Sequence, residues 1–444
     1  MTDTKKHPLG IRAFMETFDV SWGVAITAFS IGALIVLVGL WYFIHSAPPS
    51  SITISTGPEG SMFQKYAQRY AKILEANGVK MKILTSKGSP ENLDRLTNPK
   101  SHVDVAIIQG GITNDSMDDL VSLGGITYQP VLIFHRGKPI NLLSELTGKK
   151  ISIGPIGSGT RKFALAILAA NGIKEGGNTT LLDLEAQEAA DDLLNKKIDA
   201  AFIMSESASG DILKKLMHST VVNLYDFKQA SAYTRKIDYL SKLILPQGSI
   251  DLGLNIPDKD ISLVGPMVEL VAVKDLHPAL SDLLLEAATE VHGKPGIFQT
   301  RGEFPTPVEH AIKVSEDASR YYKSGKSLFY RYLPFWLASL TSRIVVVFIP
   351  MLVVLIPAMR AVPAFFRWRT MSAIRRRYRE LLLLEKEFMR EKSHIPEETL
   401  QKRFDRIDES VNKMKVKAAF ADQFYALRGH IAYVRQLSER RQAQ

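Results

Sequence analysis

Two long apolar stretches restrict the possible folds of this chain more than any other feature. The first, residues 20–44, has 25 residues without a charge. As a helix rising ~1.5 Å per residue it would cross the ~30 Å hydrocarbon core of a membrane. A cleaved signal peptide is the alternative, but the stretch is longer than a usual apolar signal region and Trp41–Ile44 lacks the small residues of a cleavage site. We therefore expect an uncleaved transmembrane helix.

The second apolar stretch is centred on residues 344–359, which also carry no charge. We expect a membrane span over residues 340–362, with the long side chains of Arg343 and Arg360 reaching the two interfaces. Two prolines inside this stretch would be unusual in a soluble helix but are tolerated in membrane helices. The alternative is a buried helix of a soluble core.

The basic residues lie mostly behind the second stretch, and they predict an orientation. The net charge is +10, and residues 360–444 hold 20 Lys or Arg against 11 Asp or Glu. Because basic flanks stay on the cytoplasmic side, we expect 363–444 in the cytoplasm and, after two spans, residues 1–19 there as well. Residues 46–330 then lie on the periplasmic side of a bacterial inner membrane. The arginines are expected to contact anionic lipid, and no motif for reading nucleic acid accompanies them.

The basic tail itself shows a helical pattern. Apolar residues from Leu381 to Val434 recur at intervals of three to four positions. This spacing predicts two or three helices packed as a hairpin or a short bundle.

One pattern of strand, loop and helix occurs twice between the apolar stretches. The loop reads Gly-Pro-x-Gly-Ser at residues 57–61 and again, 97 residues later, at 154–158. A β-branched strand precedes each copy, and a helix with one apolar stripe follows it. Both helices end at an Asn-Gly pair, a favoured helix end.

Such loops have a physical use in ligand binding. Glycines let the backbone approach a ligand, and the first helical turn points its unpaired N–H groups and the positive end of its dipole at it. If each loop belongs to one of two facing lobes, both helix starts look into one cleft, and a small carboxylate is the simplest ligand. The alternative is that both loops are ordinary turns of an α/β fold.

The remaining sequence alternates between strand and helix patterns, which predicts an α/β fold with a largely parallel sheet in each lobe. We expect lobe 1 to comprise about residues 50–130 and 245–295, and lobe 2 about 131–244. The expected strands are 80–85, 103–108, 131–135, 198–204 and 262–273, and the clearest expected helices are 186–196 and 276–292.

The sequence carries no recognisable pattern for catalysis, metal binding or cofactor binding. The chain has no cysteine, and its ten histidines show no metal-ligand spacing. The second loop is not a nucleotide-binding P-loop, because Thr160-Arg161 stands where Lys-Ser or Lys-Thr is needed. We therefore expect no enzyme activity, no metal and no cofactor.

Several motifs together resemble the TAXI-type solute-binding proteins of TRAP transporters. They are Thr56-Gly57-x-x-Gly60-Ser61, Gly88-Ser89-x-x-Asn92, the segment 103–109, the segment 146–160 and the segment 197–202. The resemblance covers about residues 50–295. It implies a type II periplasmic-binding-protein-like two-lobed fold, a ligand such as glutamate, glutamine or a small dicarboxylate, and a TRAP-type permease or other inner-membrane partner.

Together, the glycine loops and this resemblance predict a set of ligand-binding residues. They are Gly57, Gly60, Ser61, Met62, Ser89, Asn92, Gln109, Gly157, Ser158, Gly159 and Thr160. For Ser89 and Asn92 a plain role in capping the following helix, with Pro90 at its first position, is the equal alternative.

This chain also departs from the family. Met62 and Phe63 stand where a tyrosine is usual, Gly110-Gly111 follow Gln109, and Met204–Ser207 replaces a glycine-rich loop. The chain resembles a branch with a C-terminal transmembrane helix and a cytoplasmic helical tail. Two functions therefore remain: a membrane-anchored receptor for a small carboxylate, serving uptake or sensing, and a structural, assembly or signalling protein whose receptor domain no longer binds a transport substrate.

Overall fold

The computed structural model describes residues 22–112, 117–204, 209–308, 311–389, 396–414 and 420–442. The expected N-terminal segment 1–19 lies outside these residues. The chain divides into two compact units, Ala47–Ser342 and the combination of Met1–Ser46 with Arg343–Gln444. The first unit holds all the strands of the described residues.

The first lobe of Ala47–Ser342 is built on a six-stranded sheet in which β10-β11-β3-β1-β2 are neighbours and β4 pairs with β11. The strands are β1 Ser51–Ser55, β2 Lys80–Leu84, β3 Val105–Gln109, β4 Leu120–Tyr128, β10 Leu240–Leu245 and β11 Ile261–Val273. Alternate side chains enter two cores. Ile107 and Leu270 pack with α3 Met62–Ala76, α9 Pro278–His292 and α10 Glu316–Ser324. Ile108 and Val271 pack with α4 Ser89–Thr97, which a short 3₁₀ turn, Pro99–Ser101, follows.

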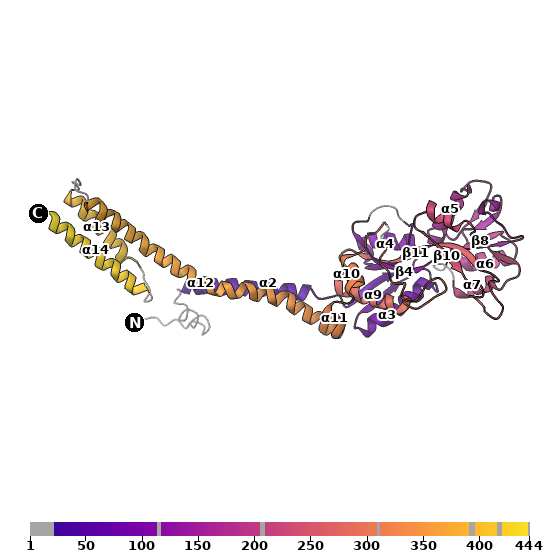
Figure 1. Cartoon of the computed structure of the whole chain (residues 1–444), viewed down its shortest axis with the longest axis horizontal. Coiled ribbons are helices and arrows are strands. Elements are labelled where there is room, and N and C mark those ends of the chain that lie inside the picture. Colours follow the sequence, from indigo (N-terminus) through magenta and orange to yellow (C-terminus); the bar gives the residue numbers. More distant parts are fainter. Residues whose placement is uncertain are drawn as a thin grey trace. The chain divides into compact units, whose positions relative to one another are not determined.

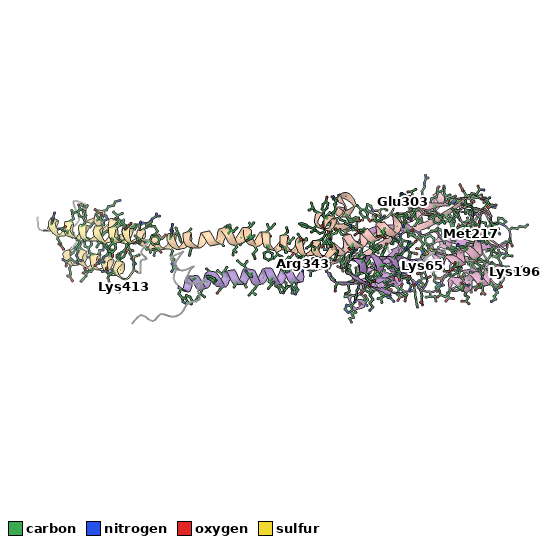
Figure 2. All side chains as sticks on the ribbon, turned by 90° about the horizontal axis from the view of Figure 1, so that it is seen from below. Lys65, Lys196, Met217, Glu303, Arg343 and Lys413 are labelled. Carbon is green, nitrogen blue, oxygen red and sulfur yellow. The ribbon has the colours of Figure 1, made fainter. Side chains whose placement is uncertain are left out.

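The second lobe contains a five-stranded sheet in the order β7-β6-β8-β5-β9. These strands are β5 Leu132–Arg136, β6 Lys150–Ser152, β7 Thr180–Leu182, β8 Ala200–Ile203 and β9 Val222–Leu224, with a 3₁₀ turn at Leu143–Leu146. Its helices are α5 Gly159–Ala170, α6 Ala186–Leu194, α7 Gly210–Met217 and α8 Ala230–Lys236. Lys65 belongs to the first lobe, and Lys196 and Met217 belong to the second (Figure 2).

The lobes are joined through β10 and β11, which lie between the helices of the two lobes in Figure 1. The first half of β11 pairs with β10, and the second half lies between β3 and β4. Leu243 and Leu263, from β10 and the first half of β11, pack in the core of the second lobe. One long strand therefore contributes to both cores.

The strands expected from sequence are confirmed, but the expectation of largely parallel sheets is wrong. In the first lobe β1 is parallel to β2 and β3, whereas β11 is antiparallel to β3, β4 and β10. In the second lobe β6 is parallel to β7 and β8, and β5 is antiparallel to β8 and β9. The reason is the crossing between lobes, because a strand that enters a sheet from the other lobe does so from the opposite end.

The repeated strand, loop and helix is confirmed at the level of the backbone. The N–H of Ser61 bonds to the carbonyl of Pro58 at 3.2 Å, and the N–H of Ser158 bonds to the carbonyl of Pro155 at 3.1 Å. The helices that follow end at Asn77 and Asn171. A glycine with positive φ, Gly78 or Gly172, comes next in each copy and closes the helix as a left-handed residue can.

The other compact unit contains the apolar helix α2 Trp22–His45 and, from Arg343 onward, the helix α12 Phe335–Met389. Two segments, Ala25–His45 and Phe335–Ala358, are long and apolar enough to cross a membrane, the second starting before the expected 340–362. The Arg343 guanidinium lies 4.8 Å from the ring centre of Phe43 and donates to its carbonyl. A Cβ on Gly39 would lie 3.5 Å from Val347. Because position 43 meets 343 and position 39 meets 347, the two helices run antiparallel.

The expected C-terminal helices are also present. The end of α12, α13 Glu397–Asn412 and α14 Ala421–Gln442 share an apolar core that includes Leu381, Phe404 and Ile431. Of the two expected arrangements, the described residues form the short bundle. A further short helix, α11 Leu328–Tyr332, precedes α12.

Candidate functional site

The second glycine loop lies against the first lobe, at the C-terminal ends of β2 and β3. The Oγ of Ser89 accepts a hydrogen bond from the N–H of Gln109 at 3.0 Å. The Nε2 of Gln109 in turn donates to the carbonyl of Gly159 at 3.1 Å. Ser89, Gln109 and Gly159, predicted as site residues from separate motifs, therefore form one chain of contacts between the lobes.

The start of α5 offers main-chain donors at this contact between the lobes. Ser158 is its N-cap, and its Oγ accepts from the N–H of Arg161 at 3.1 Å. Among the residues that the structure describes, the N–H groups of Gly157 and Gly159 donate to no acceptor. Gly157 has φ +83°, a conformation that glycine adopts without strain. Thr160 is buried beside them in the first helical turn.

Two lysines flank this helix start, and the sequence patterns did not single them out. Lys87 precedes α4, and its side chain lies 3.7 Å from the position that a Cβ on Gly157 would take. Lys162 belongs to the first turn of α5, and its Nζ donates to the carbonyl of Ile112 in the first lobe. Neither lysine pairs with a carboxylate of the described residues. Their charges and the positive end of the α5 dipole make this part of the cleft suitable for an anion.

The first glycine loop is used differently. Ser61 caps α3, accepting from the N–H of Gln64 at 3.3 Å, and the Gln64 side chain accepts from the N–H of Gly60 at 2.7 Å. The carbonyl of Gly57 accepts from the N–H of Ser86. Met62 is half-buried as the first residue of α3. The N–H groups of Gly60 and Ser61 thus have acceptors in Gln64 and Pro58, and no hydrogen bond joins this loop to the second loop among the described residues.

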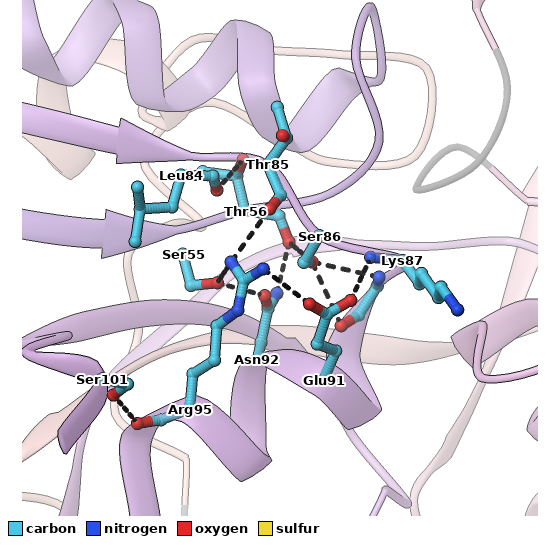
Figure 3. Close-up of polar contacts among 11 residues, drawn as sticks. Ser55, Thr56, Leu84, Thr85, Ser86, Lys87, Glu91, Asn92, Arg95 and Ser101 are labelled. Carbon is cyan, nitrogen blue, oxygen red and sulfur yellow. Dashed lines mark hydrogen bonds and ion pairs between the residues drawn. The ribbon is translucent and has the colours of Figure 1, made fainter. Parts of the chain in front are cut away.

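Asn92 lies behind the cleft edge in a polar network (Figure 3). Its Oδ1 accepts from the Oγ of Ser55 at 2.6 Å, and its Nδ2 donates to the carbonyls of Thr56 and Ile107. Arg95 extends the network, donating to Ser55 and to the carbonyl of Thr85 at 3.1 and 2.9 Å. The Asn92 amide is fully buried. In this structure its hydrogen bonds connect α4 to the ends of β1 and β3.

The expectation that Ser89 caps α4 is wrong, because Gly88 is the N-cap and Ser89 is already helical. Gly88 has φ +132°, and the Ser89 hydroxyl accepts from Gln109 instead of from the helix. Pro90 is therefore the second helical residue. Of the departing loop 204–207, the structure describes only Met204, which is buried after β8.

Tyr239 is a third residue of this region that the sequence patterns did not single out. Its ring lies where any side chain at Gly111 would be, since a Cβ there would be 2.5 Å from the ring. The same ring makes an edge contact with Phe163 of α5, with 6.4 Å between centroids. Burial raises the pKa of Tyr239, so its hydroxyl is neutral at physiological pH. The pair Gly110-Gly111 at the end of a buried strand was the one available signal that another group packs there.

Comparison with known proteins agrees with this architecture. Residues 54–290, just over half of the chain, match the NMT1-like family. The protein belongs to the NMT1-like family. The search of curated proteins gave no match.

Several solved structures of binding proteins match part of this chain at low sequence identity. An ancestral arginine-binding protein bound to arginine is 15% identical, with a TM-score of 0.33 over 55% of this chain and 92% of that chain. The GluR0 ligand-binding core from Nostoc punctiforme, in complex with glutamate, is 13% identical, with a TM-score of 0.31 over 55% and 92%. The periplasmic aliphatic sulphonate binding protein SsuA from Escherichia coli is 15% identical, with a TM-score of 0.32 over 64% and 89%. Likenesses this distant leave the ligand to be argued from the cleft itself.

Proposed function

We propose that this protein is a membrane-anchored, extracytoplasmic solute-binding protein that captures a small carboxylate between its two lobes. The start of α5 carries the proposal. There the N–H groups of Gly157 and Gly159 have no acceptor among the described residues, and Lys87 and Lys162 lie beside them. A carboxylate would accept from the backbone donors and be neutralised by the lysines. The function is binding, without catalysis, metal or cofactor.

The motifs shared with TAXI-type proteins support a narrower proposal. The ligand is an amino acid such as glutamate, or a small dicarboxylate, and it is delivered to a TRAP-type permease or sensed at the membrane. Ser89, Gln109, Gly157, Ser158, Gly159 and Thr160 form the binding surface. The first loop, with Gly57, Gly60, Ser61 and Met62, shapes the opposite wall, and Asn92 holds β1, β3 and α4 in place behind it.

The membrane topology is part of the proposal. The two apolar helices are antiparallel, which supports a two-span anchor with both termini on one side. Basic residues after the second span place that side in the cytoplasm, with anionic lipid around Arg367 and Arg369. Reporter fusions after residue 60 should then be active outside the cytoplasm, and fusions at residue 444 inside. A cytoplasmic signal at residue 60 would reject the topology.

A ligand panel tests the binding function on the full-length protein in detergent. Amino acids, dicarboxylates and keto acids are screened by thermal unfolding followed by titration calorimetry. A ligand at a hundredfold excess over its Kd should stabilise the folded protein by ~2.7 kcal/mol. The variants Gly159→Val and Thr160→Val separate an effect on binding from an effect on stability. For each variant the thermal unfolding of the ligand-free protein and the affinity for the ligand are measured. Unchanged affinity in Gly159→Val would remove the second loop from the site.

One observation favours a second candidate function. The Gln109–Gly159 and Lys162–Ile112 hydrogen bonds, together with the Tyr239 ring, join the lobes directly. A domain closed in this way by its own residues fits a structural, assembly or signalling protein that has lost a transport substrate. Unfolding curves that no member of the panel shifts would support this second function.

A further inference from the structure

The orientation of the Gln109 side chain is set by its own hydrogen bond. Its Nε2 donates to the carbonyl of Gly159 at 3.1 Å, and the reversed amide would place two acceptor oxygens against each other. Only 2% of the surface of Gln109 is exposed. The amide therefore presents its Oε1 in a defined direction, within the contact between the lobes.

That oxygen has no hydrogen-bond donor among the residues that the structure describes. The Oε1 of Gln109 is buried, and none of these residues donates to it. Buried acceptors without a partner are rare in folded proteins, because the loss of hydration is not compensated. The start of α5 beside it has donors without acceptors, since the N–H groups of Gly157 and Gly159 have no acceptor among the described residues.

Acceptor and donors are thus both unmet in one small region. A carboxylate can accept hydrogen bonds from the N–H groups of Gly157 and Gly159, but it has no donor for the Oε1 of Gln109. A ligand that carries an N–H or O–H next to its carboxylate satisfies both. On the basis of the proposed binding function, we infer that this site selects 2-amino or 2-hydroxy acids. Acids whose second carbon carries only hydrogen or a keto oxygen bind more weakly, because the amino or hydroxyl group donates a hydrogen bond to the Oε1 of Gln109.

An ordered water is the competing explanation. A cavity of about 30 Å³ is lined by residues that include Gln109, Gly111 and Glu269, and a water molecule fits in a volume of this size. If a water serves Oε1 in the ligand complex, the group at the second carbon of the ligand has no effect through Gln109.

Titration calorimetry on the full-length protein in detergent distinguishes the two. One series holds chain length and both carboxylates constant: glutarate, 2-oxoglutarate, 2-hydroxyglutarate and L-glutamate. A second series of succinate, malate and aspartate does the same one carbon shorter. The hydroxy and amino members of the better-bound series should bind at least tenfold more tightly than the unsubstituted and keto members. The neutral hydroxyl separates donation from the charge of an ammonium group.

Two variants test whether the preference for 2-amino and 2-hydroxy acids depends on Gln109. Gln109→Met keeps the length of the side chain and removes both amide atoms, so the tenfold preference should fall below threefold. Gln129→Met is the matched control, since it removes another buried amide that no hydrogen bond connects to Gly159. It should leave the preference unchanged, and apo unfolding of both variants checks that they fold.

The outcomes separate this inference from the function beneath it. Equal affinities across a series that binds would overturn the inference and leave the binding function standing. A preference for the amino acid without one for the hydroxy acid would overturn it too, because charge and not donation would then be selected. Loss of the preference in Gln129→Met would move the selection away from Gln109. If no member binds, the binding function fails and the inference fails with it.

Discussion

The two strand, loop and helix units share a backbone and differ in what the backbone is used for. In each, a serine caps the helix and bonds back to the proline three residues earlier. In the first unit the third helical residue, Gln64, reaches back to the N–H of Gly60. In the second unit Arg161 occupies that position and pairs with Glu175, so the loop keeps its donors. One side chain at one helical position thus separates a loop whose Gly60 N–H is bonded to its own helix from a loop whose equivalent N–H, that of Gly157, has no acceptor among the described residues.

The strands that lead into the loops differ in the same way. Ser55 of β1 contacts Asn92 and Arg95, whereas Ser152, 97 residues later in β6, has a buried Oγ with no partner in the described part of the chain. The helix position that corresponds to Asn92 is Ala189, buried in the core of the second lobe. At this position hydrogen bonds therefore stabilise the first lobe, and apolar packing stabilises the second. We expect the stability of the first lobe to be the more sensitive to loss of a single polar group.

The largest expected effect comes from Asn92→Leu. It would remove the three hydrogen bonds that the Asn92 amide makes, to Ser55 and to the carbonyls of Thr56 and Ile107, and would place an apolar side chain against these buried polar groups, at ~1 kcal/mol or more for each lost bond. We expect a loss of at least ~3 kcal/mol, measured by urea unfolding and located by hydrogen exchange in β1, β3 and α4. Ala189→Leu, at the matching position of the second lobe, is the control for added volume and should expose α6 instead. A loss below ~1 kcal/mol in Asn92→Leu would contradict the polar role.

The second largest expected effect is a loss of stability of the first lobe in acid. His292 is buried between the rings of Tyr66 and Tyr70, at 4.5 and 5.8 Å, and burial lowers its pKa to about 3, with Arg69 acting in the same direction. Below an ordinary pKa of ~6.5 the unfolded chain takes up a proton that the folded lobe does not, so stability falls as pH falls toward 3. The slope is up to ~1.4 kcal/mol per pH unit.

Hydrogen exchange between pH 7 and 5 measures this effect in each lobe separately. In the second lobe the main-chain carbonyl of Lys214 and the Asp251 carboxylate raise the pKa of the exposed His218, which favours the folded state in acid and loses that effect as pH rises. His292→Phe should flatten the response of α3 and α9 alone. Equal acid sensitivity in that variant would assign the effect to other groups.

A matched pair of glycines tests the two loops directly. Gly60 and Gly157 occupy equivalent positions with φ of +76° and +83°, and neither has a neighbour within 3.5 Å of an added Cβ. Alanine at either should cost ~1–2 kcal/mol of backbone strain. Only Gly157→Ala should also weaken ligand binding, by about tenfold, equivalent to ~1.4 kcal/mol. Equal affinity losses in both variants, measured by titration calorimetry, would remove the distinction between the loops.

The smallest expected effect is at the paired serines. Ser152→Ala removes a hydroxyl that has no partner and should change the free energy of unfolding by less than ~0.5 kcal/mol, with either sign. Ser55→Ala breaks contacts to Asn92 and Arg95 and should cost ~1–2 kcal/mol. Thermal unfolding of the two variants side by side measures the difference. Similar losses would mean that the second lobe also depends on this polar position.

Much of the candidate site could be predicted because its parts are local. The Gly-Pro-x-Gly-Ser loops, the serine caps and the Asn-Gly helix ends depend on residues within a few positions of one another, and the structure has them where the sequence places them. Ser158 and Gly159 were predicted as site residues on this basis, and Gln109 was predicted from the resemblance to TAXI-type proteins. Lys87 and Lys162 were not, because an isolated lysine near a helix start looks the same in a binding site and on a solvent-exposed face.

By itself the sequence determined two apolar helices, an α/β domain with a repeated unit, and a helical tail, since these follow from composition and short-range periodicity. The tertiary structure decided the rest. The direction of β5 and β11 depends on where the chain crosses between lobes. The Gln109–Gly159 bond and the packing of Tyr239 on Gly111 join segments 50 and more residues apart. Such contacts depend on how the two lobes meet, and no local pattern of residues encodes that meeting.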